Sequence, residues 1–422
     1  KALSPLAVQL HFEEFTAQKN RVDPTKIKDY LVVEDRRFKK ANGQLNDLRK
    51  KWLETINPVM EVMVMEEMEQ PRKTFLYQRG DYNSPADEVI PETPEVLPPL
   101  NPDAPKNRLG LAQWLFSDSH PLTARVAVNH YWQMLFGQGL VRTPTDFGLQ
   151  GSLPSHPKLL DWLAVEFQSK GWDIKALLKM MVLSETYQQS SKLTKELQEK
   201  DPTNIYLARN HSYRLSAEMI RDNALAISGL LVDEVGGPSV KPYQPPGLWK
   251  EKNTFSLQLL EYKKTGGDSL YRRGMYTFIK RGSPPPSMVS FDATSREICT
   301  VKRENTSTPL QALVLLNDTQ YFEAARFLAQ RLKQEKGTTL EEQLINGFRL
   351  VTSRFPKQQE LDILLNQYKR QLSHFKKHPQ EAKKIIQVGD KKADSNLNFT
   401  ELGALTIVAN TLLNHTESYY KR

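Results

Sequence analysis

The residues best suited to chemistry are arginines, aspartates and one histidine that stand at loops and helix ends. The candidate ligand-binding residues are Arg142, Arg221, Arg281, Arg296 and Arg303, and the candidate catalytic residues are His156, Asp222 and Asp292. Arginine donates paired N–H groups to a carboxylate or a sulfate, and histidine transfers protons near neutral pH. The sequence therefore predicts one polar cleft for an anionic group. Internal pairing of these arginines with acids, which would fix the loops, is the alternative.

The densest of these segments runs from residue 276 to residue 318, YTFIKRGSPPPSMVSFDATSREICTVKRENTSTPLQALVLLND. A loop of this length is usually functional or disordered, and its apolar and aromatic residues favour order. It leads into a helix whose start is indicated by Thr308, Pro309 and Gln311, a capping box with proline in the first turn.

Other kinds of site have weaker signals. His374 and His378 are four residues apart but lack the glutamate of H-E-x-x-H, so we predict a helix end and no metal site. Cys299 is the single cysteine, which excludes a disulfide within the chain. Ile298 and Val301 beside it predict a buried, slowly reacting thiol, and activation by Lys302 is the alternative. We find no G-x-S-x-G motif and no phosphate-binding glycine loop.

Composition limits the classes of partner. The 422 residues are 39% hydrophobic and 25% charged, with 58 basic and 49 acidic residues. This modest basic excess is typical of a solvated surface, and the lysine pairs between residues 376 and 392 lack the interleaved aromatics of a nucleic-acid site. No apolar run approaches the length of a membrane span. The first residues, KALSPLAVQLHFEEF, are interpreted as a trimmed start without a signal peptide.

Hydrophobic periodicity predicts a mainly α fold, a multi-helix domain with a small antiparallel β element and long irregular loops. The N-terminal flank, 1–104, should hold a long helix over 26–56, a hairpin of 59–68 with 73–82, and a proline-rich connector.

The helical domain, 105–422, should contain an inserted irregular region, 238–307, in which 272–282 forms a strand that joins the hairpin. Helix starts are predicted from cap residues at Asp173, Ser216, Thr308 and Thr339. The helix that begins at Ser216 is expected to run to residue 231.

Several segments resemble the planctomycete-type PSD domain, a family of unknown function. The run NRLGLAQWLFSDSHPLTARVAVNHYWQMLFGQGLVRTPTDFG and its continuation to residue 191 carry the resemblance first. It continues in GGPSVKPYQPPGLW, LYRRGMYTFIKR and SREICTVKRENTSTPLQALVLLND, in that order. The similarity extends over roughly residues 105–350.

The resemblance implies an exported, periplasmic or extracellular protein of planctomycetes, verrucomicrobia or Bacteroidetes. It also implies a cytochrome c-like domain in the same full-length protein, so haem is expected in that domain and no cofactor in this chain. Genes of the family often lie beside sulfatases and polysaccharide-degrading enzymes, which connects it with polysaccharide utilisation. The resemblance supplies no catalytic residues and leaves open whether the chain is an enzyme.

Two functions follow as expectations. The leading one is a module that binds or acts on an acidic or sulfated polysaccharide or its fragments. The alternative is a non-catalytic helical scaffold that docks a cytochrome domain or another exported enzyme.

Overall fold

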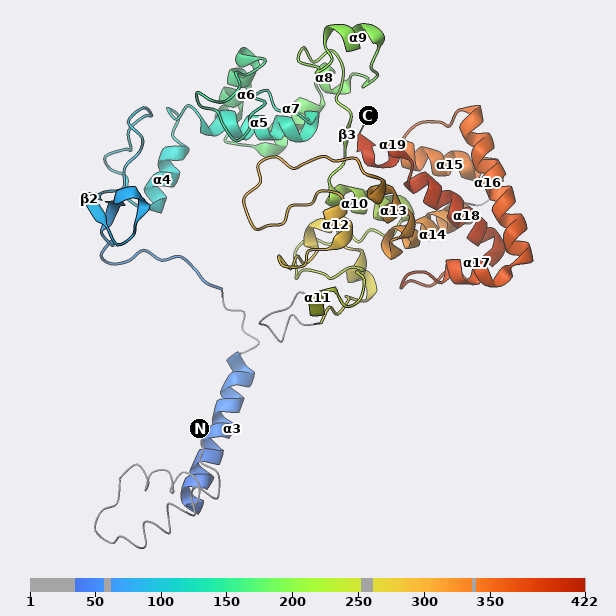
Figure 1. The fold of residues 1–422 in the computed structure, drawn as a ribbon, viewed down its shortest axis with the longest axis horizontal. Coiled ribbons are helices and arrows are strands. Elements are labelled where there is room, and N and C mark those ends of the chain that lie inside the picture. The colour runs from blue at the N-terminus through green and yellow to red at the C-terminus, as the bar shows by residue number, and fades with distance from the viewer. Residues whose placement is uncertain (1–34, 57–61, 252–260, 336–338, 422) are drawn as a thin grey trace. The chain divides into compact units, whose positions relative to one another are not determined.

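The computed structural model describes residues 35–56, 62–251, 261–335 and 339–421, and most of these residues are helical (Figure 1). The predicted fold class is confirmed, because many helices accompany small antiparallel sheets and long irregular segments. The chain divides into two compact units, Lys1–Pro91 and Glu92–Arg422. The boundary predicted at residue 104 stays a prediction.

The described part of the first unit begins with a long helix, α3 (Arg36–Ile56). The side chain of Asp35 begins it by accepting hydrogen bonds from the backbone amides of Arg37 (2.7 Å) and Phe38 (3.1 Å), as helix N-caps do. The helix predicted over 26–56 is thus confirmed from Arg36 onward, and its earlier residues lie outside the described part.

The same unit contains a hairpin of β1 (Thr74–Tyr77) and β2 (Pro85–Val89), with the short 3-10 helix η1 (Gln78–Gly80) between them. The strand predicted within 73–82 is confirmed, but its predicted partner is wrong. Residues 62–68 form no strand, and 59–61 lie outside the described residues. The tight turn after β1, where Asp81 accepts the amide of Asn83 (3.0 Å), closes a shorter hairpin than the predicted one.

The second unit holds the other elements. Its α-helices begin with α4 (Arg108–Leu115), α5 (Thr123–Phe136), α6 (Pro157–Ser169), α7 (Ile174–Val182), α8 (Glu185–Gln188), α9 (Lys195–Lys200) and α10 (Ala217–Ser228). They continue with α11 (Leu248–Glu251), α12 (Pro286–Ser290), α13 (Pro309–Asn317), α14 (Thr319–Gln334), α15 (Leu340–Thr352), α16 (Gln358–Lys377), α17 (Pro379–Ile386), α18 (Phe399–Leu413) and α19 (Thr416–Tyr419). The strands β3 (Tyr213–Arg214) and β4 (Tyr420–Lys421) pair with each other.

Two apolar cores organise this unit. The larger one joins α10 and α12 to the C-terminal helices, and Figure 1 shows α18 among α14, α15, α16 and α17. Helix α18 is mostly apolar, and Ala404, Leu405 and Val408 in it are fully buried, as expected for a central helix. The smaller core is formed by α5, α6 and α7 around Trp132 and Phe136.

The predicted helix starts are confirmed where the signal was local. Asp173 and Ser216 accept hydrogen bonds from the amides of Ala176 and Met219, and Thr308 and Thr339 form capping boxes. The predicted end of α10 is wrong by three residues. The helix ends at Ser228 because Gly229 adopts the left-handed conformation (φ 77°), which terminates helices.

The strand predicted over 272–282 is also wrong. This segment contains the 3-10 helix η4 (Gly274–Tyr276), follows the 3-10 helix η3 (Gly267–Tyr271), and makes only isolated bridges from Arg272 to Val232 and from Thr277 to Val240. Its backbone turns because the amide of Gly274 donates to Asp222 on α10 (2.6 Å). The segment 272–282 is therefore attached to α10. Among the described residues, it forms no strand pairing with the hairpin.

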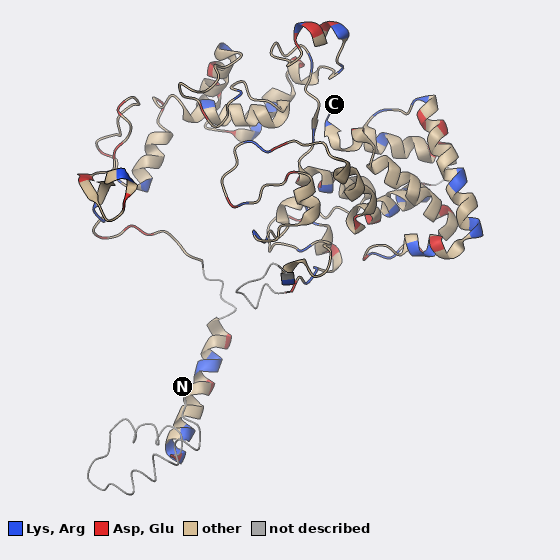
Figure 2. Ribbon diagram, in the orientation of Figure 1, with Lys and Arg blue, Asp and Glu red and all other residues tan. Residues whose placement is uncertain are grey.

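Charged residues of both signs are spread over the elements in Figure 2. In α16 the acidic side chain of the first turn is Glu360, and the basic ones of the last turn include Lys376 and Lys377, the order that the helix dipole favours. Of the helices described, none has the length and apolar character that a membrane crossing needs.

Candidate functional site

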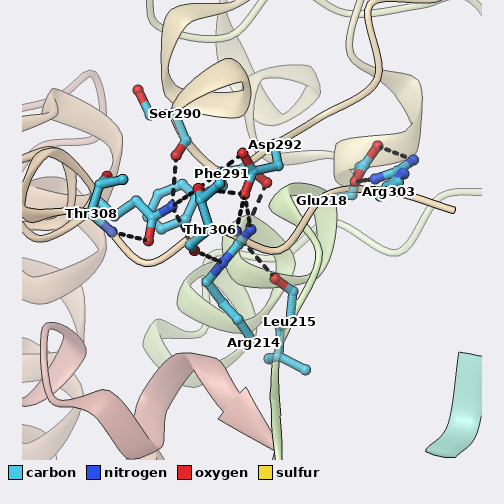
Figure 3. A network of polar contacts seen from close by, with 10 residues as sticks. Arg214, Leu215, Glu218, Ser290, Phe291, Asp292, Arg303, Thr306 and Thr308 are labelled. Carbon is cyan, nitrogen blue, oxygen red and sulfur yellow. Dashed lines mark hydrogen bonds and ion pairs between the residues drawn. The ribbon is translucent and has the colours of Figure 1, made fainter. Parts of the chain in front are cut away.

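A buried arginine fixes the base of the long loop that follows α12 (Figure 3). Arg214, whose side chain is 2% exposed, forms an ion pair with Asp292 (Nη2 to Oδ2, 2.6 Å). Its other N–H groups donate to the backbone oxygens of Leu215 (3.1 Å), Phe291 (3.2 Å) and Thr306 (3.2 Å). The guanidinium thus holds both ends of the loop at once.

Asp292 connects the two ends directly. It accepts hydrogen bonds from the backbone amide and the hydroxyl of Thr306, both at 2.8 Å. Gln311 adds bonds to the backbone oxygens of Ser290 (3.0 Å) and Thr306 (3.1 Å). Burial acts to raise the pKa of Asp292, but the bonds from Thr306 and the charge of Arg214 outweigh it and lower this pKa. We call residues 293–305, which these contacts close into a loop, the clamped loop.

The clamped loop is exposed from residue 295 to residue 305. Ile298 is 76% exposed and Val301 is 40% exposed. Arg296 has a φ of 60°, a conformation that costs a non-glycine residue energy and persists where the surrounding structure enforces it. A second attachment comes from Arg303, whose guanidinium donates to both carboxylate oxygens of Glu218 on α10 (2.6 and 3.1 Å).

The prediction that Cys299 is buried is wrong, because the thiol is exposed in the clamped loop. The apolar neighbours that suggested burial point to solvent as well. We expect a thiol reagent to label native Cys299 completely at neutral pH, at a rate that denaturant leaves nearly unchanged. Labelling that becomes fast only after unfolding would contradict this placement.

Helix α10 carries three acidic or basic side chains, Glu218, Arg221 and Asp222. Arg221 is buried, and its guanidinium donates to Gln320 (2.9 Å), to the backbone oxygen of Leu270 (2.9 Å) and to that of Arg272. Asp222 is half-buried, and burial raises its pKa. Burial also acts to raise the pKa of Glu218, but the bonds and charge of Arg303 and the charge of Arg296 lower it.

Glu218 and Asp222 are one helical turn apart, and their pKa values shift in opposite directions. Such a pair resembles an acid and a base in an enzyme. Both carboxylates are nevertheless engaged, Glu218 by Arg303 and Asp222 by the amide of Gly274. The contacts indicate a structural role for each of them.

A second polar location lies where the loop after α5 meets the segment before β3. A small pocket of about 20 Å³ is lined there by Trp132, Leu140, Arg142, Ser155, Asn204 and His211. The backbone amide of Arg142 donates to Ser152 (3.1 Å), whereas its guanidinium has no hydrogen bond or ion pair to any described residue. We call this the Arg142 pocket.

The eight candidate residues therefore fall into several groups. One group lies on or beside α10 and contains Asp222, Asp292, Arg296 and Arg303. In it, Asp222 accepts the amide of Gly274, and Asp292 pairs with Arg214. Arg142 lines the Arg142 pocket, and His156 lies beside it, hydrogen bonded to the lining residue Ser155 (3.0 Å). Arg221 is in the core and Arg281 is exposed on a turn. Their roles in ligand binding or catalysis stay predictions.

A wider groove, of about 360 Å³, is formed by residues 386–399. Two of its charged side chains are paired, Asp390 with Lys264 and Lys391 with Asp268 (3.0 Å). Within the described ranges, no three side chains of the metal-ligating types gather in one place. His374 instead contacts Glu381 (2.7 Å).

Sequence reasoning missed the residues that organise both locations. Arg214 and Glu218 meet partners 78 and 85 residues away, and no local pattern indicates those partners. Arg209 and His211 lie in ARNHSYR, a cation-rich segment outside the helices. The same density of cations that selected the other loops could have selected this one.

Comparison with known proteins gives a family without a function. A family model described as PSD1, protein of unknown function (DUF1553), matches residues 107–368. Searches of curated proteins and of solved structures returned no match. The matched range covers well over half of the chain and includes the clamped loop, α10 and the Arg142 pocket lining. The chain therefore belongs to the PSD1 family of proteins of unknown function.

Proposed function

We propose that this chain is a non-catalytic helical scaffold that docks another protein domain through the clamped loop. The partner we propose is the cytochrome c-like domain of the same full-length protein, which would carry the haem. Another exported enzyme is the alternative partner. The observation that carries the proposal is that the clamped loop is fixed at its base yet exposed from residue 295 to residue 305.

Rigidity at the base supports a binding role. A loop that is held in one conformation before binding loses less conformational entropy when a partner covers it. The contacts of Arg214 and Asp292 supply that rigidity, and Arg303 adds the second attachment. Loops held on rigid helices are common binding elements.

Exposed apolar side chains adjoin the loop. Ile298 and Val301 lie on it, Leu310 and Leu313 are exposed on α13, which follows it, and Met219 is exposed on α10 beside Glu218. Aliphatic side chains grouped on neighbouring elements are typical of protein contact surfaces when they form a patch. Because α10 and α13 both contact α12, these elements are neighbours in the fold.

The docking proposal is tested with a double substitution, Ile298→Asp with Val301→Asp. We expect the affinity for the cytochrome c-like domain, measured by calorimetry, to fall by about tenfold or more, since two carboxylates would enter an apolar contact. Leu149→Asp with Leu153→Asp is the matched control, because these leucines are exposed aliphatic side chains on another loop. Equal affinities for the two variants would refute docking through the clamped loop.

Binding of an acidic or sulfated glycan is the second candidate function. The observation in its favour is the guanidinium of Arg142, which lacks a partner among the described residues and lines a pocket. Retention on immobilised dextran sulfate, compared with neutral dextran at the same ionic strength, tests it. Equal retention on the two polymers would exclude this candidate.

A location in the periplasm or outside the cell belongs to the same proposal and rests on the family resemblance. Fractionation of cells that express the full-length gene, followed by immunoblotting, measures it. Recovery of the protein in the cytoplasmic fraction alone would contradict this location.

A further inference from the structure

We infer that the Arg142 pocket binds a single oxyanion group, a carboxylate, a sulfate or a sulfate ester. The inference is independent of docking through the clamped loop, which lies elsewhere on the chain. Its basis is a small pocket lined by Arg142 and His211, with no carboxylate among the described lining residues and with Arg209 and Lys421 acting on His211. Arginine and a protonated histidine are the side chains that suit such a group.

Two further cations, Arg209 and Lys421, act on His211 from outside the pocket lining, and both bind neutral groups. Arg209 donates to the backbone oxygens of Asp201 (3.0 Å) and Pro202 (2.9 Å). Lys421 donates to the backbone oxygen of Leu135 (2.8 Å) and to the amide oxygen of Asn210 (3.4 Å). Backbone and amide oxygens satisfy the N–H donors but leave the positive charge in place.

The nearby carboxylate is already engaged. Asp201 is buried, and its two oxygens accept the backbone amides of Ile205 (2.7 Å) and Tyr206 (2.9 Å). One occupied carboxylate thus stands against two permanent cations, Arg142 and Arg209, and against Lys421, whose pKa burial lowers to about 8. A positive potential in a partly enclosed site attracts an anion.

The size of the pocket limits the ligand. A volume of about 20 Å³ holds little more than one water molecule. Only the oxygens of one carboxylate or sulfate can enter, and the rest of a larger ligand would stay outside. The hydroxyl of Ser155 at the rim adds a donor that a tetrahedral sulfate could use beside the fork of Arg142.

His211 couples this binding to protons. Burial lowers the pKa of its imidazole, and the charges of Arg209, Lys421 and Arg142 lower it further, against an opposing effect of Asp201. The ring has no hydrogen bond to a described residue, so it is available to a ligand. A bound anion stabilises the imidazolium, which raises the pKa of His211 and makes affinity increase as pH falls.

The test uses inorganic sulfate and methyl sulfate as probes, titrated by calorimetry at constant ionic strength. We expect both to bind, more tightly at pH 6 than at pH 8, because His211 and Lys421 are both more fully protonated at the lower pH. Arg142→Gln should weaken binding by about tenfold or more. Tighter binding of methyl sulfate would identify an ester as the natural group, and tighter binding of inorganic sulfate would identify the free ion.

Arg281→Gln is the matched control, because Arg281 is exposed and lies away from the pocket lining. It should leave the affinity unchanged. The resonances of the His211 ring give a second readout, since their titration should move to higher pH when sulfate is added. The absence of binding by wild type, or equal weakening by the two substitutions, would overturn the inference.

Discussion

Replacement of Arg326 by leucine is expected to lower the free energy of unfolding by about 3–5 kcal/mol. Arg326 and Glu323, both on α14, are 0% exposed and form an ion pair (3.4 Å). Leucine leaves the carboxylate of Glu323 buried without its compensating cation. The loss of one partner from a buried pair costs far more than the net stabilisation from the intact pair.

The other contacts of Glu323 explain why its charge cannot leave the core. It accepts the hydroxyls of Tyr243 (2.8 Å) and Tyr271 (2.9 Å) and the amide of Lys391 (2.9 Å). Burial and the charge of Glu323 raise the pKa of both tyrosines, so both donate at neutral pH. Arg326 also holds residues 388–391 through the backbone oxygens of Val388 (3.1 Å) and Lys391.

Chemical denaturation measures this effect. Lys333→Leu on the same helix is the control, because Lys333 pairs with a Glu401 that is 43% exposed. This substitution should cost no more than about 1 kcal/mol. Similar losses of stability for Arg326→Leu and Lys333→Leu would show that the buried ion pair stabilises the fold no more than the exposed one does.

Asp292→Asn is expected to cost about 3 kcal/mol and to expose the clamped loop to proteases. Asparagine tolerates the φ of 57° at this position nearly as well as aspartate, so the substitution changes the charge and leaves the backbone unstrained. It leaves Arg214 buried and without an anion, although the arginine keeps its backbone acceptors. We therefore expect the loss of stability to lie near the lower end of the range for breaking a buried ion pair.

The pH dependence gives an independent measurement of the same contact. Because the pKa of Asp292 is lowered in the folded protein, its contribution to stability is present above the pKa of an unfolded aspartate. That contribution is lost as the pH falls through the folded value. Wild type should thus lose more stability in acid than Asp292→Asn does, whereas parallel acid profiles would contradict the ion pair.

Arg303→Gln tests the contact between the clamped loop and Glu218 separately from the contacts of Arg214 and Asp292 at the base of the loop. The side chain of Arg303 is 39% exposed, so solvent screens its pair with Glu218. We expect a loss of no more than about 1 kcal/mol, with little change in proteolysis at the base of the loop. A loss of stability as large as that of Asp292→Asn would mean that Arg214 and Asp292 are not the main attachment of the loop.

Local signals in the sequence predicted the helices well. Thr308 and Thr339 each accept the amide three residues later, an interaction contained within a few residues. The β element depended on more distant choices. The strand within residues 73–82 could pair with the segment before it or with the one after it. The turn around Asp81 determined that it pairs with Pro85–Val89.

The functional residues show the same difference between local signals, which the sequence reveals, and distant contacts, which it does not. The sequence selected the segments of Asp292, Arg303 and Arg142 from their density of charge, and these segments do carry the clamp and the pocket. It gave no partner for any of them, because Arg214 and Asp292 meet only after the chain has folded over 78 residues. The placement of Cys299 was wrong for a related reason, since clamping at the base holds apolar residues out in solvent.

The labelling rate of Cys299 tests the central claim most directly, because this thiol lies within the clamped loop and is the single cysteine of the chain. The rate is measured with and without a saturating amount of the cytochrome c-like domain. Docking over residues 293–305 predicts that the domain slows labelling by about tenfold or more, as burial protects a thiol. A complex that forms while Cys299 reacts at its free rate would contradict the claim.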